Sequence, residues 1–214
     1  MSPDVPFRSL LVTSPAPSEG KTTVGVSIAI AMAQAGQRVL LVDCDLRRPR
    51  VHRVFGKANT VGLTTAVVDG CAPESIALET GIPNLSIVPS GPLPPNPAEL
   101  FHSERFKSVL RRLTECYDRV IIDSPPVVAV TDAAVLSTLV DGVVLVARAF
   151  STPKEIARHA ARAITDVGGR VVGAVLNAVN LDRHEYKYRY YYYRRDGAYY
   201  REDAEAPGAS GKAA

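Results

Sequence analysis

The sequence has few cysteines, little net charge and no long apolar run. Its cysteines are Cys44, Cys71 and Cys116, an odd number at wide spacing, which indicates reduced thiols and shows no metal-binding pattern. The start, MSPDVPFRS, has no apolar signal core, and no apolar stretch approaches the length of a membrane span. A net charge of +3 gives no bulk electrostatic reason to expect nucleic acid or membrane binding. We therefore expect a soluble cytoplasmic chain, either complete or the cytoplasmic part of a longer protein.

The composition that remains is that of a globular protein. With 214 residues, of which 46% are apolar and 22% charged, the chain is long enough to bury a core without disulfides. Hydrophobic periodicity stops after Asn177, and residues 202–214 are small and polar, as in disordered segments. We expect one folded domain over residues 1–180 and a flexible, tyrosine-rich tail over residues 181–214.

Short β-branched runs alternate with longer helical patterns in the expected domain. Most of the runs are apolar without alternation, which indicates strands covered on both faces. Strands that alternate with helices predict an α/β fold, with a mostly parallel central sheet and helices on both faces. Strands are expected at residues 9–14, 38–43, 85–90, 119–123, 141–148 and 170–177, helices at 21–35, 97–116, 132–139 and 153–167, and short helices and loops at 50–81.

The stretch SPAPSEGKTT, residues 14–23, follows the first expected strand and opens the first expected helix. In that context backbone N–H groups near Gly20 can cradle phosphate oxygens, Lys21 can reach the β- and γ-phosphates of ATP, and the Thr22 hydroxyl can bind Mg²⁺. Pro15 stands where the pattern G-x-x-x-x-G-K-[ST] has its first glycine. The stretch predicts the three-layer fold of P-loop NTPases, with a nucleotide site that includes Pro17, Ser18, Glu19, Gly20, Lys21, Thr22 and Thr23.

Carboxylates follow two of the expected strands. Asp43 and Asp45 come directly after a strand in LLVDCDLRR, and Asp123 comes directly after another in VIIDSPP. Because the carboxyl ends of parallel strands border the ligand site, all three can face the same phosphates and hold Mg²⁺, directly or through water. The alternative for any one of them is that a strand-end Asp caps the following loop. Arg47 either holds a phosphate or pairs with an Asp.

Tyrosine gathers near the end of the sequence. Eight of the nine tyrosines lie between residues 186 and 200, interleaved with arginines. Four adjacent tyrosines match neither strand alternation nor one helical face, so a packed core is not expected there. With an ATP site upstream, the run is interpreted as a phosphate acceptor, while stacking on bases or lying on an anionic membrane are the alternatives. The predicted acceptors are Tyr186, Tyr188, Tyr190, Tyr191, Tyr192, Tyr193, Tyr199 and Tyr200.

Together these motifs resemble the bacterial tyrosine kinases (BY-kinases) of capsule and exopolysaccharide export. The similar residues are Ser14-x-x-Pro17-x-Glu19-Gly20-Lys21-Thr22-Thr23, then Asp43-x-Asp45-x-Arg47 and Asp123-Ser124-Pro125-Pro126, the last two each after three aliphatic residues. HRVFG, GPLPPNPAEL and the terminal tyrosines are also similar to family sequence. The resemblance runs from about Phe7 to Tyr200.

The resemblance implies an ATP- and Mg²⁺-dependent protein-tyrosine autokinase. In such a kinase Lys21 would contact the phosphates, and Asp43 would orient or deprotonate the incoming tyrosine. Metal ligation would come from Thr22, Asp45 and Asp123. Asn177, after the last strand, is expected either to contact adenine, as in similar folds, or to be a turn residue. The residues expected to be catalytic are thus Lys21, Asp43, Asp45, Arg47 and Asp123.

The resemblance also implies partners. Such kinases phosphorylate the C-terminal tyrosines of a neighbouring copy, assemble into rings, and work with a membrane activator on the same chain or a separate one. The resemblance thus implies a location at the inner face of the cell membrane and a role in regulating polysaccharide polymerisation and export. Family members usually carry a helix before the first strand that contacts the next subunit, and only residues 1–6 precede the strand here, so weakened ring assembly is expected. No nucleic-acid partner is expected, because no binding module is recognisable.

Two other functions stay open from the sequence. Partition and cell-division ATPases share the sheet and the acidic strand ends, but they carry a signature lysine where this sequence has Ala16, and they give no reason for a tyrosine tail. A domain that binds ATP without catalysis could instead be a scaffold for polysaccharide chain-length control. Phosphotyrosine formed in the tail from ATP would separate the kinase from both alternatives.

Overall fold

The computed structural model describes residues 7–180, and within them seven strands form a single sheet. The strand order is β3-β4-β2-β5-β1-β6-β7, and every neighbouring pair is parallel except β3 with β4. This confirms the mostly parallel sheet predicted from the apolar runs; the two-residue strand β3 was not predicted. The strands are β1 (Ser9–Thr13), β2 (Val39–Asp43), β3 (Leu78–Glu79), β4 (Leu85–Val88), β5 (Arg119–Asp123), β6 (Gly142–Arg148) and β7 (Val171–Asn177).

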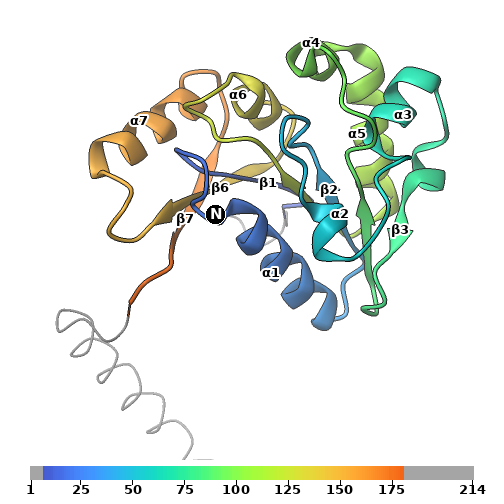
Figure 1. Ribbon diagram of the computed structural model, residues 1–214, viewed down its shortest axis with the longest axis horizontal. Coiled ribbons are helices and arrows are strands. Elements are labelled where there is room, and N and C mark those ends of the chain that lie inside the picture. The colour runs from blue at the N-terminus through green and yellow to red at the C-terminus, as the bar shows by residue number, and fades with distance from the viewer. Residues whose placement is uncertain (1–6, 181–214) are drawn as a thin grey trace, which may run out of the picture. The chain divides into compact units, whose positions relative to one another are not determined.

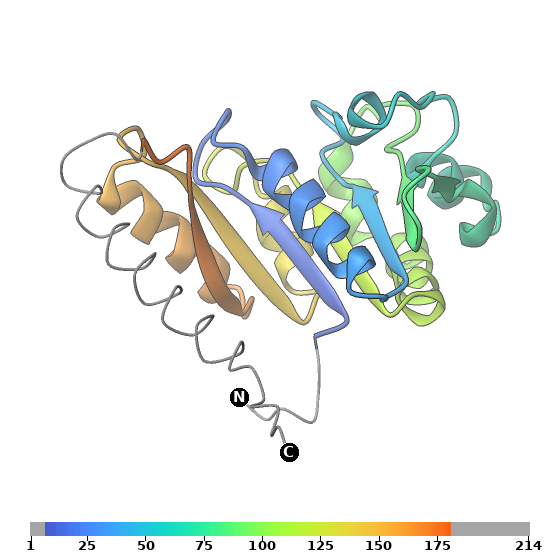
Figure 2. The same ribbon diagram turned by 90° about the horizontal axis from the view of Figure 1, so that it is seen from below.

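Helices cover both faces of the sheet, as the predicted three-layer arrangement requires (Figures 1 and 2). One apolar cluster packs α1 against the strands, and a second packs α3 to α7 against the opposite face. The helices are α1 (Lys21–Gln34), α2 (Val51–Val54), α3 (Leu63–Asp69), the 3-10 helix η1 (Pro73–Ile76), α4 (Pro97–His102), α5 (Glu104–Cys116), α6 (Asp132–Ser137) and α7 (Lys154–Thr165).

Helix α1 is apolar nearly all round, which predicts burial, with Val24, Ile28 and Met32 in the core. The helix does pack on the sheet, but these three side chains are only half-buried. The deepest positions of α1 include Gly25 and Ala29. Small residues lie deepest because they let the helix axis approach the strands closely, while longer side chains splay to either side of the contact line.

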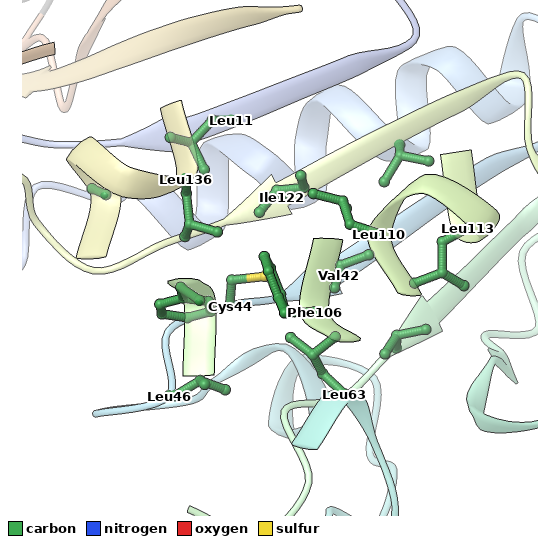
Figure 3. Packing of buried hydrophobic residues seen from close by; sticks show 14 of the residues in the cluster. Leu11, Val42, Cys44, Leu46, Leu63, Phe106, Leu110, Leu113, Ile122 and Leu136 are labelled. Carbon is green, nitrogen blue, oxygen red and sulfur yellow. The ribbon is translucent and has the colours of Figure 1, made fainter. Parts of the chain in front are cut away.

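The helix predicted over residues 97–116 is divided in two at Ser103. The Ser103 hydroxyl accepts a hydrogen bond of 3.1 Å from the Phe106 N–H and so caps the start of α5. Phe101 and Phe106, on either side of the break, pack edge to face with ring centroids 5.0 Å apart. Figure 3 shows Phe106 in the second cluster together with Cys44, which is fully buried.

The chain divides into two compact units, Met1–Asn177 and Ala178–Ala214. Of the second unit, only residues 178–180 belong to the described part of the chain. Among residues 7–180, no helix has both the length and the apolar character needed to cross a bilayer.

Candidate active site

The loop between β1 and α1 has the backbone shape of a phosphate-binding loop. Gly20, at φ +94°, is the last residue before α1, and Ser18 is also left-handed at φ +64°. The Ser14 hydroxyl donates to the Ala16 carbonyl at 2.7 Å, and the Ala16 N–H donates to Glu19 Oε2 at 2.9 Å. The loop therefore closes on itself through its own side chains.

The start of α1 lies directly against the carboxylates that end β2 and β5. Asp43 and Asp123 are neighbours in register on these two strands. The Thr22 hydroxyl donates to Asp123 Oδ2 at 2.6 Å, and Lys21 Nζ lies 2.9 Å from Asp45 Oδ2. The structure thus brings together five of the residues that the sequence motifs single out.

Two of these carboxylates are fully buried and hard to ionise. Burial, and then the nearby Asp123 carboxylate, raise the pKa of Asp43 to about 7. Burial also raises the pKa of Asp123 to about 6, against the opposing effect of Lys21. Both carboxyl groups therefore keep their protons to a higher pH than an exposed aspartate does.

The donor atoms at this place suit Mg²⁺. Asp123 Oδ1 is buried and has no hydrogen-bond partner within residues 7–180, and the Thr22 hydroxyl lies beside the same carboxylate. No group of three His, Cys, Asp or Glu side chains within residues 7–180 is arranged to hold a metal. Mg²⁺, however, usually takes one or two carboxylates and completes its shell with phosphate oxygens and water. The residues present fit Mg²⁺ that arrives together with a nucleotide.

Asp43 also has a structural task. Its Oδ2 accepts hydrogen bonds from the N–H groups of Arg50 at 3.0 Å and Val51 at 2.9 Å, and its Oδ1 accepts one from Asp45 at 3.2 Å. The carboxylate thereby holds the segment between β2 and α2 in place. The capping role that is common for a strand-end Asp is present here, alongside the position next to Asp123.

Arg47 pairs with an Asp, one of the two alternatives left open by the sequence. Its Nε lies 2.8 Å from Oδ2 of Asp132 and its terminal nitrogen 3.0 Å from Oδ1, a bidentate arrangement. Asp132 is fully buried at the start of α6. The pair ties the segment after β2 to α6, which begins at Asp132 as the helix predicted over residues 132–139 does.

Asn177 at the end of β7, Arg148 at the end of β6 and Thr152 in the connection that follows β6 contact the phosphate loop. Asn177 Nδ2 donates to the Glu19 carbonyl at 2.9 Å, and Arg148 donates to the Ser18 carbonyl at 3.1 Å. The Thr152 hydroxyl donates to the Glu19 carboxylate. Arg148 and Thr152 could not be found from the sequence, because their partners lie some 130 positions away and Ser-Thr-Pro signals only a helix start.

The other predicted site residues lie on the rim or beyond the described chain. Pro17 and Ser18 are exposed on the loop, and Thr23 is exposed on the first turn of α1. The predicted acceptor tyrosines, between Tyr186 and Tyr200, lie outside the described residues.

Fold and site together define a class: a mostly parallel α/β domain of the P-loop NTPase type, with its phosphate loop facing acidic strand ends. A family profile described as an AAA domain matches residues 18–153. Tyrosine-protein kinase YwqD of Bacillus subtilis is 40% identical over 190 residues, which cover 89% of this chain and 80% of YwqD. Putative tyrosine-protein kinase CapB of Staphylococcus aureus is 38% identical over 86% of this chain and 81% of CapB. The chain belongs to the bacterial tyrosine-protein kinases.

Solved structures agree with this assignment. The chimerical protein CapA2B2 superposes with a TM-score of 0.79 at 37% identity, covering 83% of this chain and 78% of that one. The kinase domain of Escherichia coli tyrosine kinase ETK gives a TM-score of 0.77 at 33% identity, covering 80% and 68%. The septum site-determining protein MinD of Pyrococcus horikoshii, with a TM-score of 0.70 at 21% identity over 82% and 72%, shares the fold alone.

Proposed function

We propose that this kinase domain transfers the γ-phosphoryl group of ATP to the tyrosines at 186–200 of a neighbouring copy. The observation that carries the proposal is the meeting of the phosphate loop with the acidic strand ends, through the Thr22–Asp123 and Lys21–Asp45 contacts. Phosphoryl transfer needs mainly positioning, charge neutralisation and an acceptor for one proton. The tail would supply the hydroxyl groups that accept the phosphoryl group. Residues 7–177 would supply the positioning, the charge neutralisation and the proton acceptor.

Nucleotide binding would rearrange the charges of the site. In the structure Lys21 neutralises Asp45, and both side chains are largely buried. On binding ATP, Lys21 would turn to the β- and γ-phosphates, which leaves Asp45 free to serve the metal with Thr22 and Asp123. Mg²⁺ at that place neutralises charge on the phosphates and makes γ-phosphoryl transfer easier. The exchange would keep Asp45 and Asp123 next to a cation, as buried charges require.

In the transfer step, the tyrosine oxygen forms a bond to the γ-phosphorus while the bond from that phosphorus to the β–γ bridging oxygen breaks. The phenolic proton goes to Asp43, whose raised pKa of about 7 suits a base that works near neutrality. Asp43 has no exposed surface, and backbone N–H groups hold it. The segment between β2 and α2 must therefore shift before a tyrosine reaches the carboxylate.

The division of the chain, its partners and its location are also proposed. Residues 1–180 would be the kinase domain and 181–214 the acceptor tail; copies would associate, and ATP and Mg²⁺ would be the cofactors. This chain covers only 26% of tyrosine-protein kinase Wzc of Salmonella typhimurium, at 38% identity over 86% of this chain, so that relative has much additional sequence. We place the kinase at the cytoplasmic face of the membrane with an activator that controls polysaccharide polymerisation. Fractionation of cells that leaves the kinase wholly out of the membrane fraction would contradict this placement.

The kinase activity is tested by incubating the full chain with Mg²⁺-ATP and mapping phosphotyrosine by mass spectrometry. Phosphate on Tyr186–Tyr200 is expected, and Lys21→Met should abolish it. Because Lys21→Met also leaves the Asp45 carboxylate buried without its cation, the melting temperature of the variant is measured alongside. Lys107→Met, which removes only an exposed ion pair with Glu104 on α5, is the matched control and should retain activity.

The partition-type ATPase is the alternative that the same assay decides. Likeness to MinD at 21% identity gives no argument for a shared function. ATP hydrolysis without phosphotyrosine, even in the presence of a membrane activator, would favour the ATPase or a scaffold and would sink the kinase proposal.

A further inference from the structure

We infer that Arg148, Asn177 and Thr152 are positioning residues that aim the N–H groups of the phosphate loop at bound phosphates. The inference rests on the proposed nucleotide site, and it gives these residues a task that contact with adenine would not explain. All three come from the carboxyl ends of β6 and β7 or from the connection that follows β6.

The geometry of the peptide bond links these carbonyl contacts to the direction of the loop's N–H groups. In a trans peptide the C=O and the following N–H point in opposite directions. Arg148 holds the carbonyl of Ser18 at 3.1 Å, and Asn177 holds the carbonyl of Glu19 at 2.9 Å. The N–H groups of the same two peptide units belong to Glu19 and Gly20, so they point away from Arg148 and Asn177. None of the hydrogen bonds within residues 7–180 uses these two N–H groups as donors.

Close packing strengthens the Asn177 contact. A methyl group added at Gly20 would lie 2.0 Å from Asn177 Nδ2, so the amide occupies the space that any other residue at position 20 would fill. Gly20 also has a φ of +94°, where side chains are strained. Residue 20 is therefore glycine both for its backbone angle and for the approach of Asn177.

Thr152 acts on the loop through Glu19. The Thr152 hydroxyl accepts a hydrogen bond of 2.8 Å from the Arg148 N–H and donates to the Glu19 carboxylate, which accepts in turn from the Ala16 N–H. Such a chain of hydrogen bonds stiffens all its members. In other P-loops the first glycine of the motif helps to shape the loop, and this sequence has Pro15 at that position. The chain of hydrogen bonds through Thr152 and Glu19 takes over this role here.

The test compares the binding of ADP and of inorganic tripolyphosphate to the full chain, both with Mg²⁺. Arg148→Met, Thr152→Val and Asn177→Leu should each weaken the binding of both ligands by about ten-fold, which corresponds to a loss of about 1.4 kcal/mol. Thr152→Ser keeps the hydroxyl and should bind as the wild type does. In kinase assays the Michaelis constant for ATP should rise more than the turnover number falls.

Tripolyphosphate separates the two tasks of Asn177. A residue that acts only on adenine would lose affinity for ADP and keep it for tripolyphosphate, which would overturn the inference for Asn177. Arg38→Met and Thr165→Val, which remove an exposed arginine and an exposed threonine hydroxyl, are matched controls and should change neither affinity.

Three outcomes decide the matter. Variants at positions 148 and 152 that melt earlier but bind both ligands like the wild type would overturn the inference and leave the kinase proposal standing. If Arg148→Met does not fold, the comparison of Thr152→Val with Thr152→Ser still tests the inference. A Thr152→Ser variant that binds both ligands as weakly as Thr152→Val does would count against it. A folded wild type that binds neither ligand would overturn the nucleotide site itself.

Discussion

At the level of single residues, Asp123 combines full burial with an incomplete set of hydrogen bonds. One of its oxygens accepts from Thr22, and the other has no partner among the described residues. Its pKa is raised from 3.8 to about 6, so the folded chain holds a proton that the unfolded chain releases between those values. The free energy of unfolding therefore falls as pH rises through this window. Above pH 6 the folded protein carries the full destabilisation that comes from burying the ionised Asp123.

Asp123→Asn should accordingly stabilise the nucleotide-free protein at pH 8. The rise of the pKa by about two units corresponds to about 3 kcal/mol, so the melting temperature should rise by roughly 6–12 °C. The amide oxygen of the variant would still accept from Thr22, and position 123 would no longer bury a charge. At pH 5 the difference in stability between the variant and the wild type should fall to about half of its value at pH 8, because wild-type Asp123 is then largely protonated in the folded state. Thermal melts in EDTA at both pH values measure this.

Asp118→Asn is the control for this prediction. Asp118 is exposed and pairs with Arg38 at 3.0 Å, and its pKa is lowered by that residue, so its loss should not raise the melting temperature at either pH. An Asp123→Asn variant that melts at or below the wild-type temperature at pH 8 would show that the ionised Asp123 carboxylate does not destabilise the folded protein.

At the level of elements, the predictable part of the fold is the part that local pattern dictates. The strands β1, β2 and β5 end within one residue of their predicted ends, because buried parallel strands are continuous apolar runs. The break at Ser103 escaped prediction, since the sequence on both sides of it is helical. In the structure the Ser103 hydroxyl caps α5, and Phe101 packs on Phe106 across the break.

The site shows the same limit. Asp43, Asp45 and Asp123 could be placed together because strand ends converge in a parallel sheet. The Arg47–Asp132 pair and the contacts of Asn177 with the phosphate loop join residues far apart in the sequence, and no local pattern encodes them. Residue type shows that a side chain can bind, whereas its partner is set by tertiary packing.

Two glycines of the phosphate loop and α1 should respond oppositely to alanine. Gly25→Ala should raise the free energy of unfolding by about 0.5–1 kcal/mol, because the new methyl would meet Val12 at 3.8 Å, an ordinary contact, and alanine favours helix. Gly20→Ala should lower it by more than 1 kcal/mol, because of the 2.0 Å collision with Asn177 and the positive φ.

Urea unfolding of the full chain measures both changes. Gly36→Ala, which has open space around it but also a positive φ of +86°, separates the two causes at Gly20. A loss at Gly20 no larger than the loss at Gly36 would mean that the contact with Asn177 contributes nothing.

At the level of the whole molecule, the proposed transfer between copies makes phosphorylation of the tail depend on association. The phosphate loop and Asp43 belong to the unit Met1–Asn177, and the predicted acceptors begin at Tyr186. Under this proposal the rate of tail phosphorylation should rise with protein concentration. The tail would also change its charge, since each phosphate adds about −1.5 to −2 at neutral pH.

Transfer between copies is tested most directly by mixing two full-length variants with Mg²⁺-ATP. One carries Lys21→Met and an intact tail, and the other has an intact site and phenylalanine at all eight tail tyrosines. The account predicts phosphotyrosine between residues 186 and 200 of the Lys21→Met copy, found by mass spectrometry and absent when either variant is incubated alone. An unmodified Lys21→Met copy beside a wild-type chain that phosphorylates its own tail under the same conditions would contradict it.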